Sequence, residues 1–157
     1  MRVCLVIFVL FVATPAIAFD AMQLAKFKAL NKCEKCDLSG ANFSVSAELD
    51  SSGPDLSGAK LSHANLRGAN LSGTNLSKAN LSEADMSYSK LIKTNLNRVN
   101  LRNVDLRKAD LTEADLRGAD LTGANLSTAD LTGAKIKGAI LCKTMMPWGE
   151  ENSDCQK

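Results

Sequence analysis

The sequence predicts an all-β solenoid, a rod of stacked coils in which the chain turns a corner every five residues. Three observations predict this fold. A large apolar residue recurs at every fifth position from Pro54 to Cys142. A small residue stands two places before it, and Asn or Asp most often stands directly before it. Ser, Thr or Gly often follow, and Ser and Gly are typical of places where a chain changes direction.

A period of five fits neither ordinary secondary structure. On an α-helix, a step of five residues rotates a side chain by about 140°, so no apolar stripe forms. In a flat strand, an odd step sends successive side chains to opposite faces. One corner per repeat removes the conflict, because the small and the large apolar residue then both point inward. Each repeat alone buries very little surface, so the coils have to stack.

The repeats resemble a known family. The run Ala119-Asp120-Leu121-Thr122-Gly123 is similar to the consensus of the pentapeptide-repeat family, and the pattern covers 18 consecutive repeats. Met86 and Ile136 replace Leu at the two irregular large positions. The resemblance implies a right-handed quadrilateral β-helix with four repeats in each coil. It implies little about function, because one fold serves many functions.

The first 18 residues have the pattern of a signal peptide. Arg2 precedes a continuous apolar run over residues 3–12, Pro15 breaks this run, and Ala16-Ile17-Ala18 fits a cleavage site. An uncleaved anchor is the alternative, but the run is shorter than the roughly 20 residues of a membrane span. We therefore expect cleavage after Ala18 and a soluble mature protein in the periplasm or outside the cell. In a photosynthetic bacterium, the thylakoid lumen becomes an alternative compartment.

The remaining chain divides by repeat phase. Asp20 is a candidate N-cap for a short capping helix over 19–31. Residues 32–45 read as a first partial coil, and residues 46–53 form a loop that absorbs a phase shift. The β-helix spans 54–142, and residues 143–157 form a C-terminal cap or tail. The stretch from Cys142 to Gly149 is similar to the tails of secreted family members.

Four cysteines remain after the expected cleavage, and an even number in an exported protein favours disulfides. Cys142 and Cys155 enclose a short tail and are the candidate pair. Cys33 and Cys36 are either buried thiols or a strained local disulfide. Zinc needs four convergent ligands, whereas only one Cys-x-x-Cys pair occurs, so we expect no metal and no cofactor.

No catalytic group stands out from the repeat. His63, the single histidine, occupies an outward repeat position, where a solvated side chain is expected. Asp110 and Asp115 are paired carboxylates, but their repeat positions explain them equally well. The glycines recur as corner residues and form no phosphate loop. The sequence therefore predicts a protein that is not an enzyme and has no small-molecule substrate.

Charge is the remaining functional signal. The net charge is +2, and a basic segment spans about one coil. Its cations form a candidate belt around the rod: Lys90, Lys93, Arg98, Arg102, Arg107 and Lys108. Either they are a solvated surface, or they dock to an anionic envelope component such as lipopolysaccharide, teichoic acid or a partner protein. Nucleic acid is disfavoured because no aromatic stacking platform is evident.

These observations predict a structural or protein-interaction scaffold of the cell envelope, with oligomers possible. The alternative is an inhibitor or immunity-type protein that binds one macromolecular target by surface mimicry. Some pentapeptide-repeat proteins imitate duplex DNA and inhibit gyrase. That mimicry needs an anionic face and access to gyrase, and both the basic belt and the signal peptide argue against it here.

Overall fold

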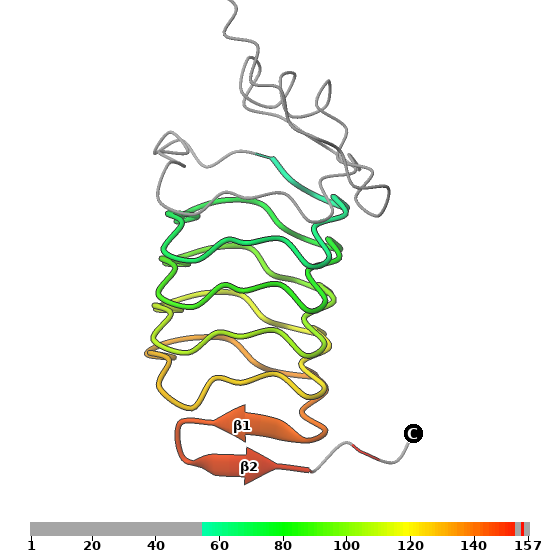
Figure 1. Ribbon diagram of the computed structural model, residues 1–157, viewed down its shortest axis with the longest axis vertical. Coiled ribbons are helices and arrows are strands. Elements are labelled where there is room, and N and C mark those ends of the chain that lie inside the picture. Colours follow the sequence, from blue (N-terminus) through cyan, green and yellow to red (C-terminus); the bar gives the residue numbers. More distant parts are fainter. Residues whose placement is uncertain (1–54, 153–154, 156–157) are drawn as a thin grey trace, which may run out of the picture.

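The computed structural model of the protein describes residues 55–152 and Cys155. The predicted signal peptide, capping helix, first partial coil and loop lie outside the described residues, as do Cys33 and Cys36. Over the described residues, the chain winds into a rod of stacked coils, with a short hairpin at its C-terminal end (Figure 1).

Parallel β-bridges join the residue directly before each large apolar residue to the residue 20 positions later, as between Asp55 and Asn75. Because each five-residue repeat makes one corner, 20 residues make a coil with four sides. Four series of stacked residues result, and we number the four sides of the rod by the residue with which each series begins: Asp55 (first side), Lys60 (second), Asn65 (third) and Asn70 (fourth).

The large apolar positions form the core. Every large residue from Leu56 to Leu126 is buried, and Leu101 in the middle of the rod is fully enclosed. The small positions two residues earlier are buried with them, as at Ala119. Complete burial of one such leucine stabilises the fold by about 1.5–3 kcal/mol. The inward direction of both series confirms the prediction from period five over these coils.

The corners explain the residues between the leucines. The Asp or Asn before the leucine accepts a hydrogen bond from the backbone N–H two residues later, as between Asp130 and Thr132 at 2.9 Å. This side-chain turn satisfies a backbone donor at the corner. From Gly58 to Lys143, the last residue of every repeat except Thr128 has a positive φ, as at Gly68 (69°) and Lys93 (57°). Glycine adopts this conformation without strain, and other residues adopt it at a cost.

Side chains also bond between coils. The amide of Asn95 donates to the Asn75 Oδ1 one coil above, at 3.1 Å. Thr94 takes a buried small position, and its hydroxyl donates to the Leu71 carbonyl at 2.8 Å. A buried hydroxyl needs such a partner, so Thr94 replaces alanine without leaving an unsatisfied polar group.

Two short strands, β1 and β2, lie at the C-terminal end (Figure 1). Strand β1 (Thr144–Met146) continues the third side, where Met145 bridges Asn125. Strand β2 (Gly149–Glu151) folds back and pairs antiparallel with β1. On the other three sides, no described residue stacks below the last coil. The last members of the large series, at Leu131, Ile136 and Leu141, are therefore only partly buried, although they still pack against the core as the inward positions do.

Candidate interaction surface

The six cations of the predicted belt point in four directions. Arg98 lies on the first side and Arg102 on the second, Arg107 and Lys108 lie on the third, and Lys90 and Lys93 lie on the fourth. A belt on a four-sided rod cannot contact one flat partner with all its charges. Two cations share a side only in the pair Arg107 and Lys108 on the third side and in the pair Lys90 and Lys93 on the fourth. Each of these pairs can contact one flat surface.

Carboxylates of the same or the next coil pair with half of these cations. Lys93 pairs with Glu113 at 3.7 Å, Arg102 with Asp120 at 3.1 Å, and Arg107 with Asp105 at 2.6 Å. Glu113 and Asp120 lie outside the basic segment and reach it only because coils stack. Lys90, Arg98 and Lys108 form no ion pair with the described part of the chain. The charge left for a partner is therefore smaller than the sequence indicates.

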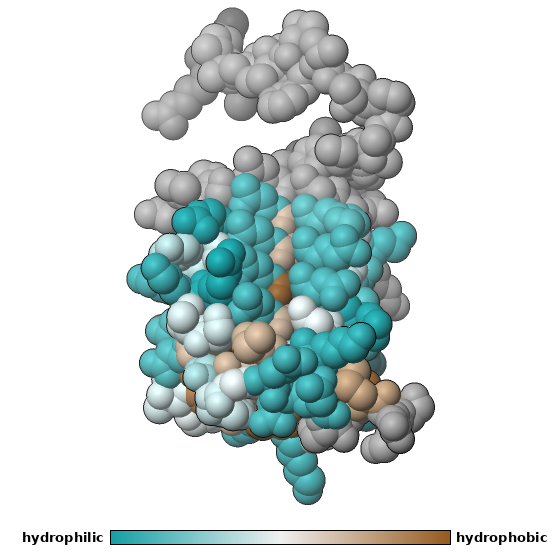
Figure 2. Space-filling model, turned by 60° about the horizontal axis from the view of Figure 1, so that its bottom comes forward, coloured by the Kyte–Doolittle hydropathy of each residue, from teal (hydrophilic) through white to brown (hydrophobic). Residues whose placement is uncertain are grey.

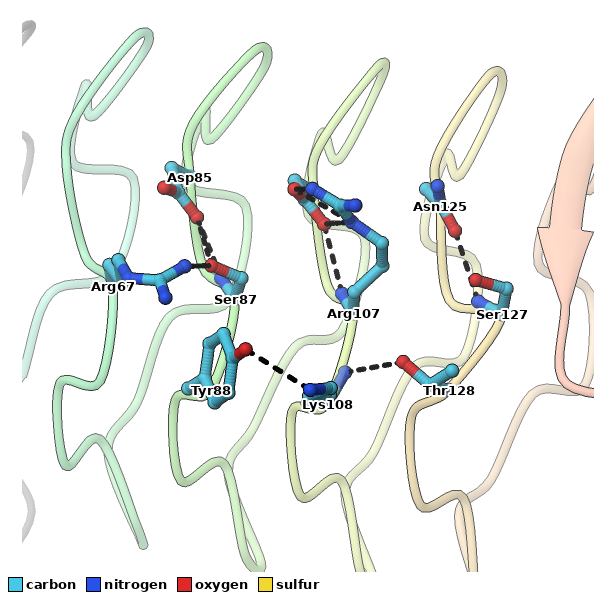
Figure 3. Close-up of polar contacts among 10 residues, drawn as sticks. Arg67, Asp85, Ser87, Tyr88, Arg107, Lys108, Asn125, Ser127 and Thr128 are labelled. Atoms are coloured by element: carbon cyan, nitrogen blue, oxygen red, sulfur yellow. Dashed lines mark hydrogen bonds and ion pairs between the residues drawn. The ribbon is translucent and has the colours of Figure 1, made fainter.

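The third side adds two residues that the belt does not contain. Tyr88 is half-exposed, and its ring has the Arg67 guanidinium carbon 4.3 Å from its centroid and the Lys108 Nζ 5.0 Å from it. These three residues come from three successive coils and lie in a row along the rod (Figure 3). We call Arg67, Tyr88 and Lys108 the Tyr88 cluster. Cations over an aromatic face are attracted by its negative charge distribution.

Hydrogen bonds hold the two cations in place (Figure 3). Arg67 donates to the Ser87 hydroxyl at 2.7 Å, and that hydroxyl donates to Asp85 at 2.6 Å. Lys108 Nζ donates to the Tyr88 hydroxyl at 3.2 Å. The hydrogen bond from Lys108 and, to a smaller degree, the nearby Arg67 guanidinium lower the pKa of Tyr88, because positive charge favours the phenolate. Neither cation has a carboxylate partner among the described residues.

The C-terminal tail is covalently attached to the rod. The sulfur atoms of Cys142 and Cys155 are bonded, with the two Cα atoms 4.6 Å apart. A depression of about 570 Å³ lies beside this disulfide and extends up the second side to Arg102 and Asp120. Those two side chains are paired with each other, so the depression offers no group that converges on a ligand.

His63 lies on an exposed corner with its Nδ1 3.4 Å from a Glu83 carboxylate oxygen, and both side chains are more than half exposed. Over residues 55–152 and Cys155, His, Cys, Asp and Glu nowhere gather in a group that could hold a metal ion. No helix in the same part of the chain is long and apolar enough to cross a membrane.

The repeat geometry agrees with a comparison against protein families. A family profile described as pentapeptide repeats matches in eight copies, over residues 55–91, 79–118 and 109–144. The chain belongs to the pentapeptide-repeat family. The matched residues make up more than half of the chain and coincide with the stacked coils. Family membership implies a right-handed β-helix.

Several solved structures are similar to this pentapeptide-repeat chain. The protein Rfr23 from the cyanobacterium Cyanothece is 32% identical, with a TM-score of 0.45, over 75% of this chain and 92% of that one. HetL from the cyanobacterium Nostoc, involved in heterocyst differentiation regulation, is 31% identical with a TM-score of 0.31, over 75% of this chain and 65% of HetL.

A pentapeptide-repeat protein from the thylakoid lumen of Arabidopsis thaliana is 27% identical, with a TM-score of 0.30. That match covers 71% of this chain and 65% of the plant protein. No curated protein sequence matches the chain.

Proposed function

We propose that this protein is an exported, non-enzymatic scaffold that docks to an anionic component of the cell envelope through the third side of its rod. The Tyr88 cluster carries the proposal. It presents two cations that have no carboxylate partner among the described residues, and hydrogen bonds and the tyrosine ring fix both of them. Fixed charges lose less conformational entropy on binding than free lysine and arginine side chains do.

The neighbouring charges also favour the third side as the docking surface. Arg107 lies next to Lys108 and is paired with Asp105, which fixes the direction of its guanidinium. Arg102 on the second side and Lys93 on the fourth are paired in the same way with acids of the next coil. The belt therefore supplies a general positive field, and the third side supplies the contact. Phosphate and carboxylate groups are the anions that arginine and lysine bind best.

Surface mimicry of a nucleic acid is less favoured. It needs a coherent anionic face, whereas the aspartates of the described coils are spread over all four sides. Asp105, Asp115 and Asp120 are moreover paired with arginines. The carboxylates are structural, because they accept the backbone hydrogen bonds that form the corners.

Export is supported by the signal-peptide pattern and by the Cys142–Cys155 disulfide, since disulfides persist in oxidising compartments. Cell fractionation followed by N-terminal sequencing tests it. We expect the protein in the envelope or medium fraction, beginning at Phe19. Full-length protein confined to the cytosol would contradict export.

Co-sedimentation of the purified protein with envelope material tests docking. We expect binding that weakens as salt rises, because exposed charges are screened over about 8 Å at physiological ionic strength. Binding that is absent at low salt, or that does not change with salt, would contradict an electrostatic docking surface. The source of the anion is then resolved with vesicles of anionic phospholipid and with isolated cell-wall polymer.

A further inference from the structure

The Tyr88 cluster keeps hydrogen-bond donors that find no acceptor among the described residues. Arg67 donates one N–H to the Ser87 hydroxyl, and Lys108 donates one to the Tyr88 hydroxyl. Both cations carry further N–H groups, and the tyrosine hydroxyl, which accepts from Lys108, still has its own hydrogen to donate. All three side chains of the cluster are exposed and lie along one side of the rod (Figure 3). Donors from three successive coils therefore meet around one tyrosine ring.

The charge around this ring is positive, because the acids of the third side are bound elsewhere. The stacked series of this side contains two acids, Asp85 and Asp105. Asp85 accepts from the Ser87 backbone N–H at 2.9 Å and from its hydroxyl at 2.6 Å, and Figure 3 shows it on the far side of Ser87 from the ring. Asp105 is paired with Arg107. An anion at the ring would meet two cations that have no carboxylate partner among the described residues.

The surroundings of the cluster favour a polar ligand. Figure 2 presents one face and the C-terminal end of the rod, where hydrophilic side chains dominate and apolar residues form small patches. The other large apolar side chains that are exposed in the described chain belong to the last coil and the hairpin: Ile140, Met145 and Trp148. Tyr88 is therefore an exposed ring among polar and charged groups, and not part of a large apolar patch.

We propose that the Tyr88 cluster binds a terminal phosphate, a phosphate monoester carried by the envelope component, through Arg67, Tyr88 and Lys108. This inference rests on the proposed docking function and names the anion that the docking side recognises. A phosphate monoester has three acceptor oxygens and a charge of about −1.5 to −2 at neutral pH, which matches three donor groups and two cations. A carboxylate or a phosphate diester has fewer free oxygens and a single negative charge, so it would leave one donor or one cation without a partner.

Methyl phosphate tests the ligand class on the purified protein, with dimethyl phosphate as the diester and acetate as the carboxylate, all at equal ionic strength. Tyr88 is the only tyrosine of the chain, so its ring gives a single set of NMR signals. We expect methyl phosphate to shift these signals saturably, with a dissociation constant at least about tenfold lower than those of the two monoanions. The absence of a saturable shift, or equal affinity for all three anions, would overturn the proposal.

Two double variants separate a site from general charge screening. Arg67→Gln with Lys108→Gln should bind methyl phosphate at least about tenfold more weakly, whereas Lys78→Gln with Arg98→Gln, on the first side, should bind as wild type does. Tyrosine absorbance gives a second readout, because a bound dianion compensates the two cations and should raise the pKa of Tyr88. In the third-side variant this pKa should be raised without ligand and should not respond to methyl phosphate. Equal binding by both double variants would also overturn the proposal.

Envelope material treated with a phosphomonoesterase connects the ligand to the docking function. The treatment removes terminal phosphates and leaves diesters and carboxylates in place. We expect treated material to bind the protein at least about tenfold more weakly than untreated material at the same salt concentration. If treated material binds as before while the third-side variant binds less, docking stands and the phosphate monoester is not its ligand. If methyl phosphate binds but untreated material does not, docking to the envelope fails and the cluster takes a free phosphate ester instead.

Discussion

At the scale of single residues, the inward leucine position should tolerate almost no change. Leu101 is fully enclosed, so Leu101→Ala should lower the free energy of unfolding by about 2–5 kcal/mol through lost burial and an unfilled cavity. Lys93→Ala is the matched surface change and should cost at most about 1 kcal/mol, because its ion pair with Glu113 is exposed. Chemical denaturation measures both values. Equal losses in the two variants would contradict the core arrangement.

Residue identity alone predicted which side chains face inward, because period five has few solutions that bury every leucine. It did not predict the Tyr88 cluster. Arg67, Tyr88 and Lys108 are separated by about one coil each, and nothing in a single repeat links them. The four-sided coil implied by the family resemblance gives the spacing. Which rotamer brings Arg67 over the ring is decided by Ser87 and Asp85, and composition does not show this.

At the scale of the element, the aspartate corners couple stability to pH. Hydrogen bonds from Arg107 lower the pKa of Asp105, and those from Arg117 lower the pKa of Asp115. Burial alone would raise the pKa of Asp120, but hydrogen bonds from Thr122 and Arg102 outweigh it and the pKa is lowered. A lower pKa in the folded protein means that folding favours the ionised carboxylate. This stability is present above the unfolded pKa of about 3.9 and is lost as pH falls through the folded pKa values.

Thermal unfolding between neutral and strongly acidic pH should therefore show a melting temperature that begins to fall below about pH 4. The double variant Asp105→Asn with Asp115→Asn should flatten the fall, because asparagine keeps the corner hydrogen bond and does not titrate. At neutral pH the variant should lose no more than about 1 kcal/mol for each exposed ion pair. A variant with the same acid sensitivity as wild type would show that these corners do not carry the pH dependence.

The C-terminal tail gives the second prediction at this scale. We expect Cys142 and Cys155 to be joined in the exported protein, and mass spectrometry of unreduced peptides detects the linked pair. Reduction should lower the free energy of unfolding by roughly 3 kcal/mol at most, because the closed loop is short. Protease should then cleave the hairpin faster than the coils. Free thiols at both positions in protein from the envelope would contradict the pairing.

At the scale of the whole molecule, the sequence predicted a rod with a cap at each end, and the structure describes one of those ends. Among the described residues after Cys142, β1 and β2 supply strands for the third side alone of the four-sided coil. The hairpin was not predictable from the repeat, which ends before it. The departure at Ile140 from the polar residue that the repeat prefers was visible in the sequence, whereas only the structure shows that no described residue bridges to Ile140 from below on the second side.

If the third side is the docking surface, the position of a cation on the rod, and not the total charge of the protein, controls binding to the envelope. The variant Arg67→Gln with Lys108→Gln removes two cations from the third side. The variant Lys78→Gln with Arg98→Gln removes two cations from the opposite, first side, where neither residue has an ion pair among the described residues. All four side chains are replaced by polar groups of similar length, so both variants should keep melting temperatures close to that of wild type.

Binding of these two variants to purified envelope material, compared with wild type across a salt titration, tests the central claim most directly. We expect the third-side variant to bind at least about tenfold more weakly at low salt and to show a shallower salt dependence. We expect the first-side variant to bind nearly as wild type does. Equal weakening in both variants would assign the attraction to net charge, and equal binding by all three proteins would show that the Tyr88 cluster is not a docking site.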